Sequence, residues 1–330
     1  IKKKKSQPAD FTFSNSKPVS VIICAKNEAA NLQKNLPFIL NQKYKEFEVV
    51  VVDDNSTDLT RAVLEELSSK NSSLRVIYLK EKIGLGKKYA LQKGIETAKN
   101  ELVLLTDADC KPVSENWITD MTSCVTGEKK IVLGVSPYYT ESTFLNALIE
   151  YETAQTALQY LGFAIAGNPY MSVGRNVLYD KELWLSKKWT TEELAIASGD
   201  DDLAIQTLAN AKNTTVCLYE SSYTYSEAKT TWKTYVTQKL RHYQSSELYS
   251  FSHKVYLGLY ASTKILMYFA IIFSFLCIIQ INVLYLIYVI AYIPITYVVN
   301  TLLHKTLKIQ KRWYYSLILD LIYCTFLLLA

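Results

Sequence analysis

The stretch ELVLLTDADCKP, residues 101–112, decides the fold of this chain. Its first six residues, 101–106, form an apolar run typical of a buried strand, and the run leads directly into Asp107 and Asp109. Two carboxylates one residue apart repel each other, so we expect a cation beside them. Hard cations such as Mg²⁺ are held by one or two carboxylates together with substrate phosphates. The stretch therefore predicts a sheet strand that ends at a metal and phosphate site.

Three similar apolar runs precede this one, and helix-like segments separate them. The runs are residues 18–26, 47–54 and 74–79, and a glycine-containing turn at 83–88 leads into a helix expected at 89–98. Alternating strands and helices predict an α/β fold with a parallel sheet and helices on both faces. Ligands bind such sheets beyond the carboxyl ends of the strands, which is where the polar residues of this sequence gather.

Composition and motifs argue against several classes of function. The 36 basic and 31 acidic residues leave a net charge of +5, which is too small to indicate nucleic-acid binding. The six cysteines contain no CxxC pair, so we expect free thiols in a reducing compartment and no structural zinc. Gly84 and Gly86 lack the third glycine of a dinucleotide-binding fingerprint, and no GxxxxGK[ST] motif is present.

An acidic run in the second half of the soluble region is a candidate for acid–base chemistry. Asp200, Asp201 and Asp202 stand in succession before an apolar helix. One of them could be a general base that removes a proton from an acceptor hydroxyl. The alternative is that the run only caps a solvated helix N-terminus.

Further along, the segment TYVTQKLRHYQ places Gln238 and Arg241 three residues apart, so that they share one face of a helix. Arg241 could bind a diphosphate through two parallel hydrogen bonds. The alternative is an amphipathic helix beside a membrane, whose cations extend to the aqueous side.

Four of these segments together resemble the nucleotide-sugar half of family 2 glycosyltransferases, which have the GT-A fold. They are PVSVIICAKNEAANL, FEVVVVDDNSTD, IGLGKKYALQKGI and LVLLTDADCKP. The resemblance covers roughly residues 17–250. It implies a basic N-terminal lead (1–16), a donor-binding half (17–130) and an acceptor-side half (131–250), in a Rossmann-like mixed sheet with helices on both faces.

The resemblance also implies roles for individual residues. Asp54 would hold the nucleobase, and Asp107 and Asp109 would hold Mg²⁺ or Mn²⁺ on the diphosphate. The implied donor-binding residues are Ala25, Asn27, Glu28, Asp54, Lys87 and Asp107. The implied acceptor or diphosphate residues are Arg175, Gln238, Arg241 and His242, where His242 replaces the tryptophan of a QxxRW motif and counts against a processive, polymer-extruding role.

In the acidic run, Asp201 aligns best with the catalytic base of the family, and Asp200 is a close rival because alignment in a run of aspartates can slip by one residue. The implied activity is an inverting, metal-dependent transfer from a nucleotide sugar, UDP being the commonest nucleotide in the family, to a hydroxyl of a glycan or lipid-linked acceptor. The alternatives are a sugar-phosphate nucleotidyltransferase, which should have a glycine-rich loop after the first strand, or an inactive membrane scaffold of the same fold.

The C-terminal region, residues 255–330, is predicted to be membrane-embedded with two or three transmembrane helices. Residues 255–279 contain one charge, Lys264, and residues 283–299 contain none. About 20 apolar residues span a bilayer. A third run, 313–330, could span the bilayer or lie in its interface, and the alternative for the first two runs is a pair of buried core helices.

The basic stretch at residues 304–312 predicts the orientation of this region. The positive-inside rule places it in the cytoplasm, and two crossings earlier residues 1–250 would lie on the same side. We therefore expect a bacterial-type inner-membrane protein with a cytoplasmic catalytic domain. The first residue is not methionine, so we also expect sequence upstream of it.

Overall fold

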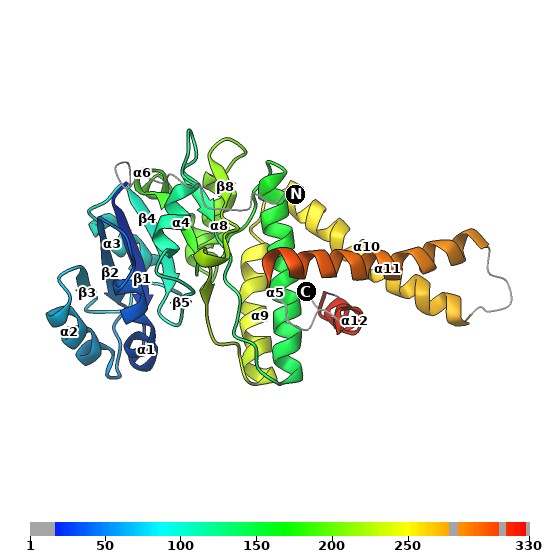
Figure 1. Cartoon of the computed structure of the whole chain (residues 1–330), viewed down its shortest axis with the longest axis horizontal. Coiled ribbons are helices and arrows are strands. Elements are labelled where there is room, and N and C mark those ends of the chain that lie inside the picture. The colour runs from blue at the N-terminus through cyan, green and yellow to red at the C-terminus, as the bar shows by residue number, and fades with distance from the viewer. Residues whose placement is uncertain (1–16, 277–282, 310–314, 328–330) are drawn as a thin grey trace.

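The computed structural model describes residues 17–276, 283–309 and 315–327. A sheet domain occupies one end of the molecule, and the C-terminal helices extend away from it (Figure 1). The basic lead at 1–16 and the turn expected between residues 279 and 283 lie outside the described residues, as do parts of the basic stretch and of the third apolar run.

Within the described residues, the main sheet has seven strands in the order β3-β2-β1-β4-β7-β6-β8. The strands are β1 (Val19–Ala25), β2 (Phe47–Asp53), β3 (Leu74–Tyr78), β4 (Leu102–Asp107), β6 (Ile131–Leu133), β7 (Val177–Asp180) and β8 (Thr214–Val216). Strands β1 to β4 are parallel, whereas β7 runs antiparallel to both β4 and β6. The predicted α/β class and mixed sheet are thus confirmed. A small second sheet pairs β5 (Lys111–Pro112) with β9 (Thr224–Tyr225).

Helices cover both faces of the main sheet, which explains why its strands are almost continuously apolar. Val49 and Val51 of β2 pack in the same hydrophobic cluster as Leu36, whereas Val50 and Val52 face a second cluster. The helices of the sheet domain are α1 (Ala29–Leu40), α2 (Thr60–Lys70), α3 (Lys88–Thr97), α4 (Trp117–Ser123), α5 (Phe144–Ile165), α6 (Lys181–Leu185), α7 (Thr191–Leu194), α8 (Asp202–Leu208) and α9 (Trp232–Ser246), with a 3₁₀ turn at Glu220–Ser222.

The register of the parallel strands brings the predicted site residues to one edge. Ala25 of β1 lies opposite Asp53, and the preceding Cys24 lies opposite Asp107. The hydroxyl of Thr106 donates to the backbone carbonyl of Arg175 (2.9 Å), so the segment that enters β7 joins the same edge. The donor half and the acceptor-side half therefore meet where β1, β2 and β4 end.

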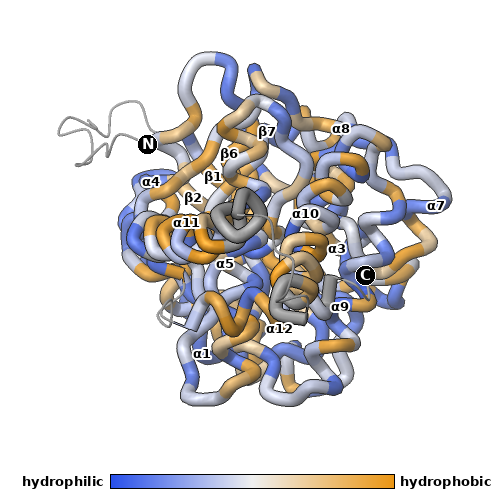
Figure 2. Tube along the Cα trace, turned by 90° about the vertical axis from the view of Figure 1, so that its right-hand side faces the viewer, coloured by the Kyte–Doolittle hydropathy of each residue, from blue (hydrophilic) through white to orange (hydrophobic). Residues whose placement is uncertain are grey.

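The C-terminal region is helical, with α10 (Phe251–Leu276), α11 (Val283–Leu307) and α12 (Ser316–Leu327), and hydrophobic residues run along all three helices (Figure 2). In the part of the chain that the structure describes, no helix is both long and apolar enough to cross a membrane. The predicted transmembrane helices are therefore not supported. Polar contacts connect these helices instead to each other and to α5: Lys264 pairs with the buried Asp320, and Gln155 donates to Asn300 (2.7 Å).

Candidate active site

The loops that follow β1 and β2 are joined by hydrogen bonds. The side-chain oxygen of Asn27 accepts the backbone N–H of Thr57 (2.8 Å), and the backbone N–H of Asn27 donates to the hydroxyl of Ser56 (2.9 Å). Asn27 has a φ of 57°, a left-handed conformation that asparagine tolerates better than most residues. The paired loops line a cavity of about 260 Å³ together with Glu28 and Asp58.

Asp54 lies at the end of β2 and is 3 % exposed. Its backbone N–H donates to the carbonyl of Ala25 (2.8 Å), which fixes the position of both predicted donor residues. One carboxylate oxygen pairs with Lys82, and the other oxygen, Oδ1, is buried without a hydrogen-bond partner in the described structure. A buried carboxylate oxygen is costly to leave unpaired. It is thus positioned to accept an N–H group, such as that of a nucleobase.

Asp107 and Asp109, at the end of β4, differ in their partners. The ammonium group of Lys87 lies 2.5 Å from Asp107 Oδ1, while Asp109 accepts the thiol of Cys110 (3.4 Å). Burial acts to raise the pKa of Asp107, but Lys87, Arg175 and Arg241 together outweigh it and the pKa is lowered. Burial and the neighbouring charge of Asp107 raise the pKa of Asp109. The pair therefore has more negative charge than the nearby protein cations balance.

The three aspartates of the acidic run lie in three different environments. Asp200 is buried and pairs with Lys87 (3.2 Å). Asp201 is half-buried and caps α8, and its carboxylate accepts the backbone N–H groups of Gly174 (2.6 Å) and Asp202 (2.9 Å). Burial and the charges of Asp200 and Asp202 raise the pKa of Asp201 to about 7. A pKa near 7 suits a general base at neutral pH.

Lys87 connects the two acidic clusters because it pairs with both Asp107 and Asp200. The turn before it also contacts the loop before the acidic run. Gly86 has a φ of 66°, and a Cβ atom built there would lie 2.0 Å from the backbone oxygen of Ala197. Lys88, which follows, donates to the carbonyls of Ile196 (2.8 Å) and Ser198. The turn at 83–88 (the donor-side turn) and the loop at 196–201, which we call the base loop after its predicted base Asp201, therefore lie at one site.

The predicted acceptor residues approach this site from α9 and from the segment before β7. The backbone carbonyl of Arg241 accepts the hydroxyl of Ser198 (2.6 Å), so α9 contacts the base loop directly. Arg175 donates to the hydroxyl of Ser226 (2.6 Å) and its guanidinium lies 4.2 Å from the centre of the Tyr138 ring. Arg175 and Arg241 both act with Lys87 to lower the pKa of Asp107 against its burial, so both face the donor side.

His242 lies where the resemblance led us to expect tryptophan. The residue His242 is exposed. Nearby protein displaces part of its hydration, and this desolvation, together with the positive charges of Lys239 and Arg241, lowers the pKa of His242 to about 3. The imidazole is therefore neutral at physiological pH and can both donate and accept a hydrogen bond. Gln238 lies one turn earlier on the same helix and is half-buried.

The described residues contain no group of three or more His, Cys, Asp or Glu side chains that could hold a metal ion. Asp107 and Asp109 offer two carboxylates, and the pKa of Asp109 is raised first by burial and then by the charge of Asp107, which a bound cation would offset. Mg²⁺ is commonly held by two carboxylates when substrate phosphates and water complete its coordination. The donor set therefore fits a divalent ion that binds together with a diphosphate.

Sequence reasoning missed four residues of the site. Lys82 pairs with Asp54, Lys88 holds the base loop, and Ser245 and Tyr249 donate to Asp202 at 2.7 Å and 2.5 Å. Asp202 accordingly does more than cap a helix. Their spacing in the sequence gives no signal, because each contacts a residue from a distant segment.

A family model described as "Glycosyl transferase family 2" matches residues 20–184, half of the chain. The chain belongs to glycosyl transferase family 2. Among curated relatives of this family 2 chain, an "Uncharacterized glycosyltransferase" of Haemophilus influenzae is 29 % identical over 48 % of the chain and 46 % of the relative. "Glycosyltransferase AglE" of Haloferax volcanii is 32 % identical over 37 % of the chain and 40 % of the relative. The chain thus spans less than half the length of these relatives.

Solved structures share the fold of this family 2 chain. The mannosyltransferase PcManGT from Pyrobaculum calidifontis, in complex with GDP-Man and Mn²⁺, aligns with a TM-score of 0.55 at 19 % identity, over 72 % of this chain and 64 % of that one. The 1–349 fragment of S. aureus TarS, in complex with UDP-GlcNAc, aligns with a TM-score of 0.50 at 20 % identity, over 65 % and 59 %. At these identities the likeness supports the GT-A-type fold alone.

Proposed function

We propose that this protein transfers a sugar from a nucleotide-sugar donor to a hydroxyl group of an acceptor, with inversion at the anomeric carbon. The observation that carries the proposal is the position of Lys87, which pairs with Asp107 of the donor half and Asp200 of the base loop. A donor diphosphate at Asp107 would therefore place its sugar beside Asp201, one residue from that ion pair.

For the donor we propose a UDP-sugar. Asp54 Oδ1 is buried and has no hydrogen-bond partner among the described residues, so it would accept the ring N–H of uracil, while Lys82 balances the charge of the other carboxylate oxygen. Lys87, Arg175 and Arg241 provide the positive charge for the diphosphate. A solved relative of the same fold binds UDP-GlcNAc, which makes that compound a reasonable first donor to test.

We further propose that Asp107 and Asp109 hold Mg²⁺ or Mn²⁺ when the donor binds. The metal ion would neutralise the charge that develops on the leaving diphosphate. The residues of the chain perform the other tasks. Arg241 and Arg175 orient the diphosphate, and the two backbone N–H groups that bind the Asp201 carboxylate fix the direction of its oxygens.

In the transfer step, the acceptor oxygen forms a bond to the anomeric carbon while the bond from that carbon to the diphosphate oxygen breaks. The acceptor proton passes to the Asp201 carboxylate, and the nucleoside diphosphate leaves with the bonding electrons. Asp200 suits the role of base less well, because its carboxylate forms an ion pair with Lys87. The neutral ring of His242 would hydrogen-bond the acceptor hydroxyl groups.

We also propose that the C-terminal helices attach the protein to a membrane surface and that the acceptor is a glycan or a lipid-linked sugar. Large apolar side chains are exposed along α10 and α11, among them Leu266, Phe269, Ile290 and Ile295, each between 59 % and 64 % exposed. Exposed apolar patches of this kind are typical of interaction sites. A bacterial-type inner membrane, with the catalytic domain in the cytoplasm, remains our proposal for the location.

The membrane proposal has a direct test in flotation with anionic phospholipid vesicles. The wild-type protein should float with the vesicles, and a Leu266→Glu, Phe269→Glu double variant should remain in solution. A Leu59→Glu variant is the control, because Leu59 is also exposed (72 %) but lies beside α2 in the sheet domain. If the double variant floats as wild type does, or if the wild type forms dimers and ignores the vesicles, the lipid assignment is wrong.

The activity has its own test, a donor screen of the full chain that measures released nucleoside diphosphate. UDP-GlcNAc, UDP-glucose and GDP-mannose would each be tried with Mg²⁺, with Mn²⁺ and with EDTA. We expect release from a UDP-sugar that EDTA abolishes. Full release in EDTA would refute the metal assignment, and no release from any nucleotide sugar would refute the proposed activity.

A further inference from the structure

Asp202 is the most deeply engaged of the three aspartates. It is the first residue of α8 and is 6 % exposed. Its Oδ2 accepts hydroxyl groups from Ser245 (2.7 Å) and Tyr249 (2.5 Å), and its Oδ1 accepts the backbone N–H of Leu203 (2.9 Å). Burying a carboxylate is costly unless it is hydrogen-bonded, and here both oxygens are satisfied. Both hydroxyl donors come from the end of α9 and the turn that follows it.

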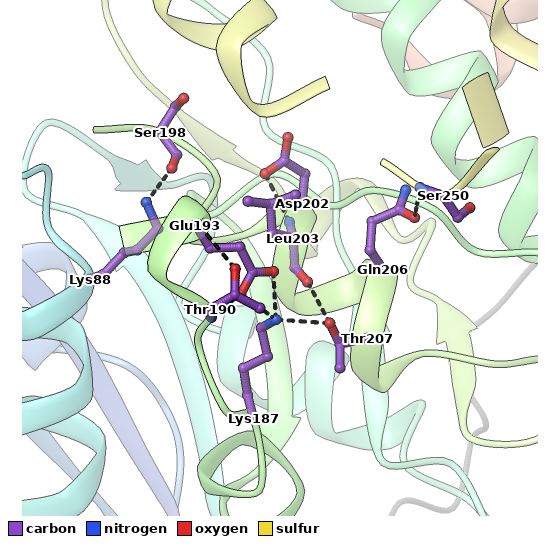
Figure 3. Close-up of polar contacts among 10 residues, drawn as sticks. All are labelled: Lys88, Lys187, Thr190, Glu193, Ser198, Asp202, Leu203, Gln206, Thr207 and Ser250. Carbon is purple, nitrogen blue, oxygen red and sulfur yellow. Dashed lines mark hydrogen bonds and ion pairs between the residues drawn. The ribbon is translucent and has the colours of Figure 1, made fainter. Parts of the chain in front are cut away.

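A second polar side chain of α8 holds the same junction. Gln206, one turn after Asp202, accepts the backbone N–H of Ser250 (3.2 Å; Figure 3). Its Oε1 also lies 2.9 Å from Nδ1 of His253. Its amide nitrogen donates to the carbonyl of Tyr170 (2.9 Å). Two successive turns of α8 therefore hold the segment between α9 and α10.

The base loop contacts α9 from the other direction. The hydroxyl of Ser198 donates to the carbonyl of Arg241 (2.6 Å). Gly199 has a φ of 86°, and a Cβ atom built there would lie 3.2 Å from the Cβ of Ser245 and 2.6 Å from the side chain of Leu203. The loop and the helix are thus packed as closely as a glycine allows.

From these contacts we infer that Asp202 is a positioning residue, which holds α9 against the base loop so that Arg241 and His242 keep a fixed place relative to Asp201. The inference rests on the proposed function, because it gives Asp201 the role of base. It separates two tasks within the acidic run: Asp201 takes the proton, and the next residue sets where the acceptor-binding helix lies.

The test compares two buried tyrosines, Tyr249 and Tyr170, whose ring centres lie 6.1 Å apart. Tyr249→Phe removes a donor to Asp202, whereas the control Tyr170→Phe removes a contact to Gln159 (3.3 Å) that does not involve the base loop. Both variants keep the ring and its packing. A hydrogen bond to a charged group is a strong one, so Tyr249→Phe should speed amide hydrogen exchange in residues 238–246 and 198–202 by about tenfold or more. Tyr170→Phe should leave both segments unchanged.

The same two variants are assayed for turnover with the donor that the screen identifies, UDP-GlcNAc being the first. Tyr249→Phe should lower kcat several-fold and leave the KM for the donor within about twofold, since a misplaced helix affects the reacting geometry rather than ground-state donor binding. Asp202→Asn should show the same split, and more strongly.

Equal exchange and equal kcat for Tyr249→Phe and Tyr170→Phe would overturn the inference. The inference would also be overturned if Tyr249→Phe raised the KM for the donor and left kcat unchanged, because the variant would then have lost donor binding rather than reacting geometry. The exchange experiment needs no substrate, so it decides whether Asp202 holds α9 even if the donor screen finds no activity. If no donor is turned over, the proposed function fails, and the exchange rates alone decide whether Asp202 holds α9.

Discussion

At the end of β4, Asp107 keeps its negative charge because Lys87, with Arg175 and Arg241, offsets the effect of burial. The pKa of Asp201 on the base loop is instead raised to about 7 by burial and by the charges of Asp200 and Asp202. The two carboxylates lie at one site, and Lys87 lowers the pKa of both. Of the two, Lys87 forms an ion pair with Asp107. Lys87 in direct contact, together with Arg175 and Arg241, thus separates a carboxylate that stays charged from one that titrates near neutral pH.

This difference suits the proposed roles. A carboxylate that holds a metal and a diphosphate must stay ionised, and a base that accepts a proton at neutral pH needs a pKa near the working pH. The following four predictions test whether the difference is real and whether Lys87 causes it, beginning with the largest expected effect.

Asp201→Asn should remove the base and keep the size of the side chain. A placed general base contributes ~10²–10⁴-fold, so turnover should fall by that factor with donor affinity nearly unchanged. Asp200→Asn should cost much less, because it removes a partner of Lys87 and not the base. Turnover and donor binding of both variants, measured side by side, decide the assignment: an inactive Asp200→Asn beside an active Asp201→Asn would mean that the base is Asp200.

Gly86→Ala should disturb the contact between the donor-side turn and the base loop. The new Cβ would lie 2.0 Å from the backbone oxygen of Ala197, so the two segments must separate. A misplacement of about 1 Å can cost on the order of 10²-fold in rate. Gly84→Ala is the matched control: its φ is also left-handed, at 71°, but no atom lies within 4 Å of the added Cβ. Equal turnover of the two variants would show that the contact is unimportant.

Lys87→Met should raise the pKa of both Asp107 and Asp201, because the lysine lowers each of them. The base would then be protonated to a higher pH, and a shift of one unit would make turnover at pH 6 about tenfold slower than in the wild type. The measurement is the pH dependence of kcat. Lys93→Met, in helix α3, which follows Lys87, removes a lysine that is paired at the surface with Glu96 and should leave the profile unchanged. A profile that does not move in Lys87→Met would refute this account.

The wild-type pH profile should show the smallest effect. Asp201 acts as a base only when it is deprotonated, so kcat should lie near its plateau at pH 8, fall about twofold at pH 7 and then drop about tenfold per pH unit. The sign for stability is opposite. Because folding raises the pKa of Asp201, its contribution to stability is fully present below the unfolded pKa of 3.8 and is lost as the pH rises through 7. Asp201→Asn should therefore melt no lower than wild type at pH 8.

The sequence predicted much of the donor half because the evidence there is local. Four apolar runs gave β1 to β4, and polar residues directly after them, such as Asn27, Asp54 and Asp107, had to gather at one edge once the strands were parallel. In the C-terminal region such reasoning is only partly supported. Its apolar runs predicted helices correctly at α10 and α11, but the transmembrane assignment was not supported.

By itself, then, the sequence determined the mixed α/β fold, the family, and the strand ends that carry Asp54, Asp107 and Asp109. Only the tertiary structure decided the environment of each aspartate of the acidic run. Identical side chains in succession give no local signal that separates them. Their environments depend on partners from distant segments, namely Lys87 for Asp200, Gly174 for Asp201 and Tyr249 for Asp202. Burial and charge set a pKa through space, and the fold alone determines which groups are neighbours in space.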